Sequence, residues 1–257
     1  MTKFDLVDRV VIVTGGGTGI GKAYSEAFAQ AGAKVVIADI ADREANQVAG
    51  EMSEIGGTVI AITTDISNED CTVSMAETTL KMFGRIDVLI NNASLMSTLK
   101  RRPWHEIEVD EWDRVMEVNL RGMFLCCRAV YPQMKKQHRG KIINISSSRF
   151  WSGAPFRLHY STSKAGVIGF TRSLAREVGD DNITVNAITP GFTESETQLA
   201  SSSSDYLLQA EKRNKERAFK RAQLPEDLVG TVMFLASDAS NFLTGQTINV
   251  DGGASMH

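Results

Sequence analysis

Tyr160 and Lys164 are the residues whose types and spacing most clearly suggest chemistry in this chain. Four positions apart on a predicted helix, their side chains share one face, one turn from each other. A free phenol loses its proton near pH ~10, and an ammonium ~4 Å away at an effective dielectric of ~20 stabilises the phenolate by ~4 kcal/mol. We therefore expect Lys164 to lower the pKa of Tyr160 by up to ~3 pH units, into the range where a general acid or base works best.

Ser147, thirteen residues upstream of Tyr160, can bond the oxygen that gains or loses this proton. Such a set suits the interconversion of an alcohol and a carbonyl, provided that a hydride carrier lies nearby. Taken alone, Ser147 could be an ordinary loop serine, because Ser146 and Ser148 flank it and only its spacing to Tyr160 distinguishes it.

The composition is ordinary for a globular protein that works in water: 257 residues, 42% of them apolar and 23% charged, with a net charge of −3. This charge balance gives no indication of a nucleic-acid or membrane partner. No apolar run approaches the ~18 residues of a membrane-spanning helix, and residues 1–5 contain no apolar signal region. We therefore expect a cytoplasmic protein that acts on a small molecule.

Cysteine and histidine give no support for a metal or disulfide site. Cys71, Cys126 and Cys127 contain no Cys-x-x-Cys pair, and the four histidines are scattered without a His-Glu-x-x-His motif. We interpret the cysteines as reduced packing residues and predict no bound metal.

Short β-rich runs alternate with helical patterns along the chain, which predicts a parallel sheet covered by helices on both faces. The expected class is α/β, a Rossmann-like doubly wound parallel sheet in a single domain spanning 1–257. Strands are predicted at 10–13, 35–38, 59–62, 86–90, 142–145 and 183–187, and helices at about 20–31, 42–55, 68–83, 110–138 and 159–178.

A polar segment over about 193–222 interrupts this alternation just after a predicted strand. Its position suggests a mobile helical lid over a substrate site. A solvated surface helix of mixed charge is the plainer interpretation, and the two are compatible.

A glycine-rich turn separates the first strand from the first helix. Glycines there let the backbone approach a pyrophosphate, while the helix N-terminus supplies N–H donors. The predicted cofactor contacts in this turn are Gly15, Gly17, Thr18, Gly19, Ile20 and Gly21. Residues 16–22 also approach a P-loop, but Ala23 replaces the hydroxyl residue that would hold magnesium, so a nucleotide triphosphatase is not expected.

Asp39 ends the second predicted strand, 24 residues after Gly15. A carboxylate there can accept from the ribose hydroxyls of an adenosine and would repel a 2′-phosphate, which favours NAD over NADP. Arg43 lies close enough in sequence to leave NADP open, and a helix N-cap is the structural alternative for Asp39.

Several motifs together resemble the short-chain dehydrogenase/reductase family, in its compact NAD-dependent branch, from about Asp8 to Gly253. The motifs are Thr14-Gly-x-x-x-Gly-Ile-Gly21, Asp65-Ile66, Asn91-Asn92-Ala93, Asn119, Ser147, Tyr160-x-x-x-Lys164, Pro190-Gly191 and Leu243-Thr-Gly-Gln-Thr-Ile-Asn-Val-Asp-Gly-Gly253. The sequence departs from the family pattern at Ser94, where glycine is common, and at Thr193, where an aliphatic residue is usual.

The resemblance implies a role for each matching position. Tyr160 would be the general acid/base, Lys164 would lower its pKa and bond the nicotinamide ribose, and Ser147 would orient the substrate oxygen. Asn119 would hold a water that links Lys164 to solvent; a helix residue bonding its own backbone is the alternative. Further cofactor contacts would come from Asp65 and Ile66 near the adenine, Asn92 near the adenosine-side ribose or the sheet end, and Pro190, Gly191 and Thr193 near the nicotinamide. The resemblance also implies a homotetramer. One candidate for a subunit contact is the apolar helix surface around Met123, Phe124, Cys127 and Val130, which could equally face the sheet.

The substrate is less well specified. The apolar side chains expected near the pocket suit a flat apolar ring; they are Leu95, Met96, Leu99, Phe150, Trp151, Phe156 and Phe192. Packing of Phe150 and Trp151 under the lid or at a subunit contact is the alternative. The loop before Tyr160 resembles NAD-dependent members that act on aromatic or cyclic secondary alcohols, of the phenylethanol or pyridoxal type.

Three further residues, Arg149, Arg157 and His159, lie close to Tyr160 in the sequence. Arg149 and Arg157 are possible contacts for an anion. His159 adjoins Tyr160, but neighbouring helix residues point ~100° apart, so we expect it to pack away from the site.

The favoured hypothesis is an NAD-dependent oxidoreductase for a secondary alcohol or ketone. One alternative is a 3-oxoacyl carrier-protein reductase, a type in the same family that usually uses NADP. A non-catalytic nucleotide-binding scaffold is the other, although such proteins tend to lose the site tyrosine or lysine, and both are present here.

Overall fold

The computed structural model describes residues 4–196, 210, 211 and 213–256. Its centre is a seven-stranded parallel sheet in the order β3-β2-β1-β4-β5-β6-β7. This confirms the Rossmann-like doubly wound α/β class. The strands are β1 Val10–Thr14, β2 Lys34–Asp39, β3 Thr58–Thr63, β4 Val88–Asn91, β5 Gly140–Ile145, β6 Ile183–Pro190 and β7 Thr247–Val250.

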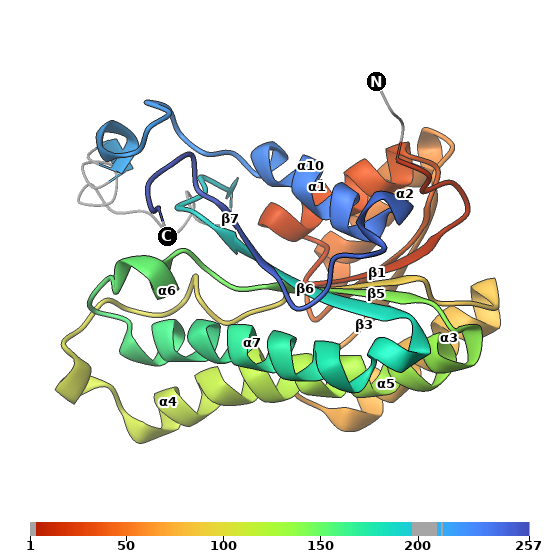
Figure 1. The fold of residues 1–257 in the computed structure, drawn as a ribbon, viewed down its shortest axis with the longest axis horizontal. Coiled ribbons are helices and arrows are strands. Elements are labelled where there is room, and N and C mark those ends of the chain that lie inside the picture. The colour runs from red at the N-terminus through yellow and green to blue at the C-terminus, as the bar shows by residue number, and fades with distance from the viewer. Residues whose placement is uncertain (1–3, 197–209, 212, 257) are drawn as a thin grey trace.

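Helices cover both faces of the sheet (Figure 1). One face carries α1 Gly19–Gln30, α2 Asp42–Glu54 and α10 Glu226–Ala236, and the other carries α3 Glu69–Phe83, α4 Val109–Met116, α5 Met123–Gln137 and α7 Leu158–Glu177. Shorter elements are α6 Arg149–Ser152 and the single turns Trp104–Glu106, Gly179–Asp181 and Asp238–Ser240.

The core lies in two layers, one on each face of the sheet. Along β1, Val11 and Val13 pack against α1 and α10, whereas Ile12 packs against α5 and α3. Successive strand residues point to opposite faces, and both faces are covered, so consecutive positions of the central strands are apolar, as at 10–13 in β1 and 88–90 in β4. This double burial produces the continuous apolar runs seen in the sequence.

The helix expected over 110–138 is interrupted by a π-helical segment, Glu117–Gly122, between α4 and α5. π-Helical turns arise where an extra residue widens the helix, and they are frequent at functional sites. This one contains Asn119, which is buried.

The surface around Met123, Phe124, Cys127 and Val130 was one candidate for a subunit contact. Met123, Cys127 and Val130 are buried in the chain's own interior, while Phe124 is 44% exposed. Most of this surface therefore faces the sheet, and the homotetramer stays a prediction.

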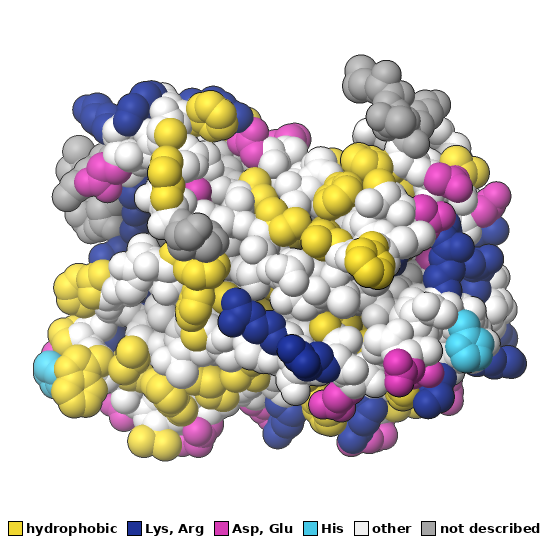
Figure 2. Space-filling view, in the orientation of Figure 1, with side chains coloured by type: hydrophobic (Ala, Val, Ile, Leu, Met, Phe, Trp, Pro, Cys, Tyr) yellow, Lys and Arg dark blue, Asp and Glu magenta, His cyan; other side chains and the backbone are white. Residues whose placement is uncertain are grey.

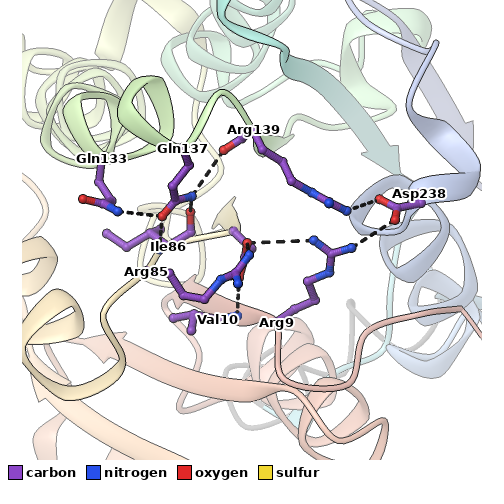
Figure 3. Close-up of polar contacts among 9 residues, drawn as sticks. Arg9, Val10, Arg85, Ile86, Gln133, Gln137, Arg139 and Asp238 are labelled. Atoms are coloured by element: carbon purple, nitrogen blue, oxygen red, sulfur yellow. Dashed lines mark hydrogen bonds and ion pairs between the residues drawn. The ribbon is translucent and has the colours of Figure 1, made fainter.

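A cluster of charged residues connects the amino ends of the strands by hydrogen bonds and ion pairs (Figure 3). The buried Asp87 carboxylate accepts from the backbone N–H of Val10 at 2.9 Å and from Arg85 at 2.6 and 2.8 Å. Arg9 donates to Asp238 at 3.0 Å, and Arg139 bonds the same carboxylate. This cluster lies at the amino ends of the strands, on the opposite side of the sheet from their carboxyl ends. We therefore assign it to stabilising the fold.

Basic and acidic side chains are interspersed on the face shown in Figure 2, with no large area of one sign. Among the described helices, none is long and apolar enough to cross a membrane.

Candidate active site

A cleft of about 1220 Å³ lies at the carboxyl ends of β1, β2, β4, β5 and β6. Ligand pockets for one drug-sized molecule occupy ~300–1,000 Å³, so this cleft has room for a dinucleotide and a substrate. Nearly all the residues predicted to bind cofactor line it: Gly15, Thr18, Gly19, Ile20, Gly21, Asp39, Asp65, Ile66, Asn92, Tyr160, Lys164, Pro190, Gly191 and Thr193. Ser147 lines it as well, whereas Gly17 and Asn119 do not.

The glycine turn needs glycine at its two ends. Gly15 has φ +62°, and a Cβ there would lie 2.9 Å from the Cα of Ala93. A Cβ on Gly21 would lie 1.9 Å from the carbonyl oxygen of Gly15, much closer than van der Waals contact. The two residues therefore allow the turn to close tightly over the start of α1.

The N-terminus of α1 fits an anionic group. Thr18 precedes the helix, but its side chain makes no capping hydrogen bond, and the first turn contains no acidic residue. The first N–H groups of an α-helix have no partner within the helix and carry its positive dipole end. With Thr18, Gly19 and Ile20 lining the cleft, these donors suit the pyrophosphate of a dinucleotide.

Asp39 is held in place by backbone donors. Its Oδ2 accepts from the N–H of Gly17 at 2.9 Å and its Oδ1 from the N–H of Ala41 at 3.0 Å. Because α2 begins at Asp42, with Ala41 before it, the N-cap interpretation of Asp39 is wrong. Gly17 was predicted to contact cofactor; it does not line the cleft, and its N–H holds the Asp39 carboxylate.

Asn92 and Thr14 join the ends of β1 and β4. The Asn92 amide donates to the carbonyl oxygens of Thr14 and Gly15 at 3.1 and 3.0 Å. The Thr14 hydroxyl accepts from the N–H groups of Asn92 and Ala93 and donates to Ile90. Asn92 was expected near the adenosine-side ribose or at the end of the sheet, and the structure shows its hydrogen bonds at the end of the sheet. The hydrogen bonds by which Thr14 supports this segment were not predicted.

Asp65, Ile66 and Thr193, which were also predicted to contact the cofactor, line the cleft. Asp65 accepts from the hydroxyl and the N–H of Ser67, and the hydroxyl bond lowers the pKa of Asp65. Ile66 is buried next to Gly122. At the end of β6, the Thr193 hydroxyl donates to the carbonyl oxygen of Gly191 at 3.2 Å.

Tyr160 and Lys164 lie side by side, with the Lys164 Nζ 5.8 Å from the centre of the Tyr160 ring. Burial raises the pKa of Tyr160 above its ordinary value, although a Ser147 hydrogen bond and the charges of Arg149 and Arg157 act in the opposite direction. Burial also lowers the pKa of Lys164 to about 7. The expectation that Lys164 depresses the Tyr160 pKa is therefore wrong for this structure, because burial dominates and Lys164 is not among the groups that lower the Tyr160 pKa.

Lys164 is anchored on the sheet side. Its Nζ donates to the carbonyl oxygen of Ile145 at 2.8 Å, and its own carbonyl oxygen accepts from the Ser146 hydroxyl at 2.6 Å. Ser146 thus positions the helix turn that carries Lys164, while its neighbour Ser147 lines the cleft. Sequence spacing singled out Ser147 and gave no signal for Ser146.

The depressed pKa of Lys164 predicts a specific dependence of stability on pH. Between pH 7 and its unfolded pKa of ~10.4, the unfolded chain holds a proton that the folded chain has released, so stability rises with pH. We expect the unfolding free energy of the wild type to rise, relative to Lys164→Met, by at most ~1.4 kcal/mol per pH unit in this window. Urea unfolding of both proteins at pH 7 and pH 9 tests this; equal slopes would mean that folded Lys164 stays protonated.

Asn119 bonds across the site rather than along its own helix. Its Oδ1 accepts from the N–H of Leu95 at 2.7 Å, and its Nδ2 donates to the Ser163 hydroxyl at 3.0 Å. The interpretation that it bonds its own backbone is therefore wrong. Asn119 connects the loop after β4 to the helix turn between Tyr160 and Lys164, and its predicted water-holding role stays a prediction.

Of the three aromatic residues between Ser147 and Tyr160, Trp151 packs against the protein, whereas Phe150 and Phe156 are exposed. Phe150, Trp151 and Phe156 do not line the cleft. The Trp151 indole donates to the Thr189 hydroxyl at 3.1 Å and its ring meets Phe150 edge-on at 4.6 Å. Phe150 and Trp151 thus do not form the wall of the cleft, and their packing under the lid or at a subunit contact stays a prediction. The substrate end is lined instead by Leu95, Met96, Leu99, Arg149, Arg157 and Phe192.

His159 packs away from the cleft as expected. It is fully buried, and its Nε2 lies 2.9 Å from the Oε1 of Glu111 on α4.

Within the predicted lid over 193–222, residues 197–209 and 212 lie outside the described residues. Its described ends are attached to the sheet. Thr193 forms a bridge with Gln223, and the Arg217 guanidinium donates to the carbonyl oxygen of Phe192 at 3.2 Å.

Comparisons with known proteins agree with the fold and the cleft. The family model described as "Enoyl-(Acyl carrier protein) reductase" matches residues 15–255. The chain is 41% identical to a 3-oxoacyl-[acyl-carrier-protein] reductase of Synechocystis sp., covering 98% of each chain. It is 40% identical to a probable galactose dehydrogenase of Rhizobium meliloti, covering 97% of this chain and 96% of that protein.

Solved structures are similar over their whole length. A 3-ketoacyl-(acyl-carrier-protein) reductase of Brucella melitensis, complexed with NADH, superposes with a TM-score of 0.89 at 31% identity, covering 98% of this chain and 100% of that one. A putative NAD(P)-dependent gluconate 5-dehydrogenase of Beutenbergia cavernae, with bound NADP, gives a TM-score of 0.90 at 34% identity, covering 98% of each.

The chain belongs to the short-chain dehydrogenase/reductase family. It is a nicotinamide-dependent oxidoreductase of the class that acts on CH–OH or keto groups.

Proposed function

We propose that the protein transfers a hydride between NAD(H) and a secondary alcohol or ketone. The observation that carries the proposal is the single cleft in which Tyr160, Ser147 and Lys164 share one space with the uncapped start of α1. The nicotinamide supplies or accepts the hydride when it is bound. The protein supplies the proton and the positioning.

Tyr160 exchanges the proton of the reacting oxygen through its phenol oxygen, and Ser147 holds that oxygen by a hydrogen bond. Arg149 and Arg157 favour the phenolate, because their charges act against the burial that raises the pKa of Tyr160. Lys164, which lines the cleft, bonds a ribose hydroxyl of the cofactor in this proposal. Asn119 and Ser146 hold the two segments that carry these groups.

We favour NAD over NADP on the basis of Asp39. Its carboxylate lines the cleft at the end of β2 and would repel a 2′-phosphate. Ile40, the next residue, offers no positive charge, and Arg43, which left NADP open, does not line the cleft.

Cofactor preference tests this choice. We expect the wild type to show a kcat/KM for NAD at least tenfold above that for NADP, and Asp39→Asn to narrow the ratio by about tenfold, the equivalent of ~1.4 kcal/mol. Asn keeps the shape and loses the negative charge. Asp42→Asn, three residues further on and exposed, is the matched control and should keep the wild-type ratio. A wild-type preference for NADP of tenfold or more would overturn the NAD proposal.

For the substrate we propose a cyclic or aromatic secondary alcohol, supported by Leu95, Met96 and Phe192 at the substrate end. The second candidate, a 3-oxoacyl carrier-protein reductase, is favoured by relatives of that name. A panel of aliphatic, alicyclic and aromatic alcohols and 3-hydroxyacyl thioesters, followed by the absorbance of reduced nicotinamide, separates the two. Tight NAD binding without turnover of any member would favour a non-catalytic scaffold. A homotetramer located in the cytoplasm completes the proposal.

A further inference from the structure

The substrate end of the cleft is rich in positive charge. The basic residues lining it there are Lys100, Arg101, Arg149, Arg157, Arg213 and Arg217. Among the described lining residues, the carboxylates are Asp39, Asp65 and Glu216, and the first two lie at the adenosine end, after β2 and β3. Arg114, which pairs with Asp65, also lines the cleft, so positive charge predominates mainly at the substrate end.

Arg149 is fixed beside the catalytic tyrosine by neutral partners. It lies at the start of α6, which packs against the N-terminal part of α7 (Figure 1). Its Nε donates to the hydroxyl of Ser161, the residue after Tyr160, at 3.2 Å. Its Nη2 donates to the carbonyl oxygens of Ala154 and Pro155 at 2.6 and 2.9 Å. A guanidinium has five N–H donors in a fixed fork. Among the described residues these bonds use Nε and Nη2, so the two N–H groups of Nη1 can donate to a ligand.

Arg157 is held in a similar way from the other side. It immediately precedes α7 and lies three residues before Tyr160. Its Nε and Nη2 both donate to the carbonyl oxygen of Leu99, at 3.1 and 2.9 Å, and among the described residues its Nη1 donates only to the sulfur of Met96, at 3.6 Å. A thioether is a weak acceptor, so this end of the guanidinium is also available for a stronger one.

Further positive charges lie near both arginines. Burial, together with the nearby charges of Arg157, Arg213 and Arg101, lowers the pKa of Arg149 to about 10, while the charge of Tyr160 acts in the opposite direction. Burial and the charge of Arg101 lower the pKa of Arg157. Within the described residues, neither guanidinium forms an ion pair with a carboxylate. Partly buried charges without a counter-ion are costly, which indicates that an anion completes this site when it is bound.

We infer that Arg149 and Arg157 form an anion subsite next to Tyr160, and that the substrate is a hydroxy acid or keto acid whose carboxylate binds there. A planar guanidinium matches a carboxylate through paired N–H donors. This inference rests on the proposed function, because it names the substrate of the same cleft. Hydride transfer would occur at the carbinol carbon, while the carboxylate stays unchanged and sets the orientation.

The position of the subsite favours a carboxylate carried close to the reacting carbon. Arg149 bonds the residue next to Tyr160, and Arg157 lies one helix turn before it. A carrier-linked thioester presents its phosphate at the far end of a long flexible arm, which would not reach a pair of partly buried arginines beside the tyrosine. An acyl thioester thus leaves this subsite unfilled.

Matched acid and ester pairs test the inference. The probes are mandelate, 3-hydroxybutanoate and 3-hydroxy-3-phenylpropanoate, each beside its methyl ester and assayed with NAD and with NADP. We expect at least one acid to exceed its ester in kcat/KM by tenfold or more. Arg149→Gln and Arg157→Gln should each reduce that acid-to-ester ratio by at least tenfold. Since both members of a pair use Tyr160, the ratio is insensitive to any change in the pKa of the tyrosine.

A control variant and three outcomes complete the test. Arg128→Gln removes a positive charge on α5, where Arg128 pairs with Glu69, and should keep the wild-type ratio. The inference is overturned if no acid exceeds its ester by more than threefold, or if the two arginine variants lower acid and ester turnover equally, which is the mark of a purely structural role. Absence of wild-type turnover with every acid, ester and neutral alcohol would instead contradict the proposed function.

Discussion

Tyr160→Phe is expected to lower kcat for alcohol oxidation by ~10²–10⁴-fold, the usual contribution of a positioned general acid or base. The substitution removes only the phenol oxygen, because the ring, with 7% of the residue exposed, stays in its packed position. NAD(H) affinity and the melting temperature should therefore change little. Stopped-flow measurement of nicotinamide reduction, together with titration of NADH fluorescence, separates chemistry from binding.

Tyr131→Phe is the matched control for this prediction. The Tyr131 hydroxyl donates to Asp181 at 2.8 Å, remote from the cleft lining, so its removal should leave kcat at the wild-type value. Turnover by Tyr160→Phe at the wild-type rate would contradict the role assigned to the phenol.

Gly21→Ala is expected to abolish measurable NAD(H) binding and to destabilise the fold. The new Cβ would lie 1.9 Å from the carbonyl oxygen of Gly15 and 2.6 Å from the Asn92 amide nitrogen. Since the first contact is with backbone, the turn itself must move, and overpacking of this kind typically costs ~1–3 kcal/mol or more. Calorimetric titration with NADH and urea unfolding measure the two effects.

Gly50→Ala provides the comparison within the same protein. Gly50 lies inside α2, and a Cβ there meets nothing within 4 Å. Alanine is favoured over glycine in a helix by ~1 kcal/mol, so this variant should be at least as stable as the wild type and bind NADH normally. NADH binding by Gly21→Ala with wild-type affinity would show that the glycine turn is not part of the cofactor site.

The sheet and the positions along its carboxyl edge could be predicted from the sequence because they depend on local signals. Double burial makes β1 and β4 continuously apolar, and the glycines at 15 and 21 mark a turn that no larger residue permits. Asp39 was placed correctly because it ends a strand whose limits the apolar pattern defines. By contrast, β7 and α10 were not predicted as elements.

The contacts that organise the site depend on three-dimensional packing, and they were missed. Ser146 and Ser163 act through single hydrogen bonds to Lys164 and Asn119, for which sequence spacing carries no information. The π-helical turn at Asn119 lies within a pattern that predicts an uninterrupted helix. The Tyr160–Lys164 pair was predicted from helical spacing alone, which gives proximity but omits the burial that raises one pKa and lowers the other.

Transfer of deuterium from substrate to cofactor tests the central claim most directly. The protein would be incubated with NAD and each secondary alcohol of the panel, deuterated at the carbinol carbon, and the reduced nicotinamide would be analysed by mass spectrometry. We predict that label appears in the reduced nicotinamide with at least one alcohol in the wild type and is strongly diminished in Tyr160→Phe. NAD binding without label transfer from any alcohol would contradict the account.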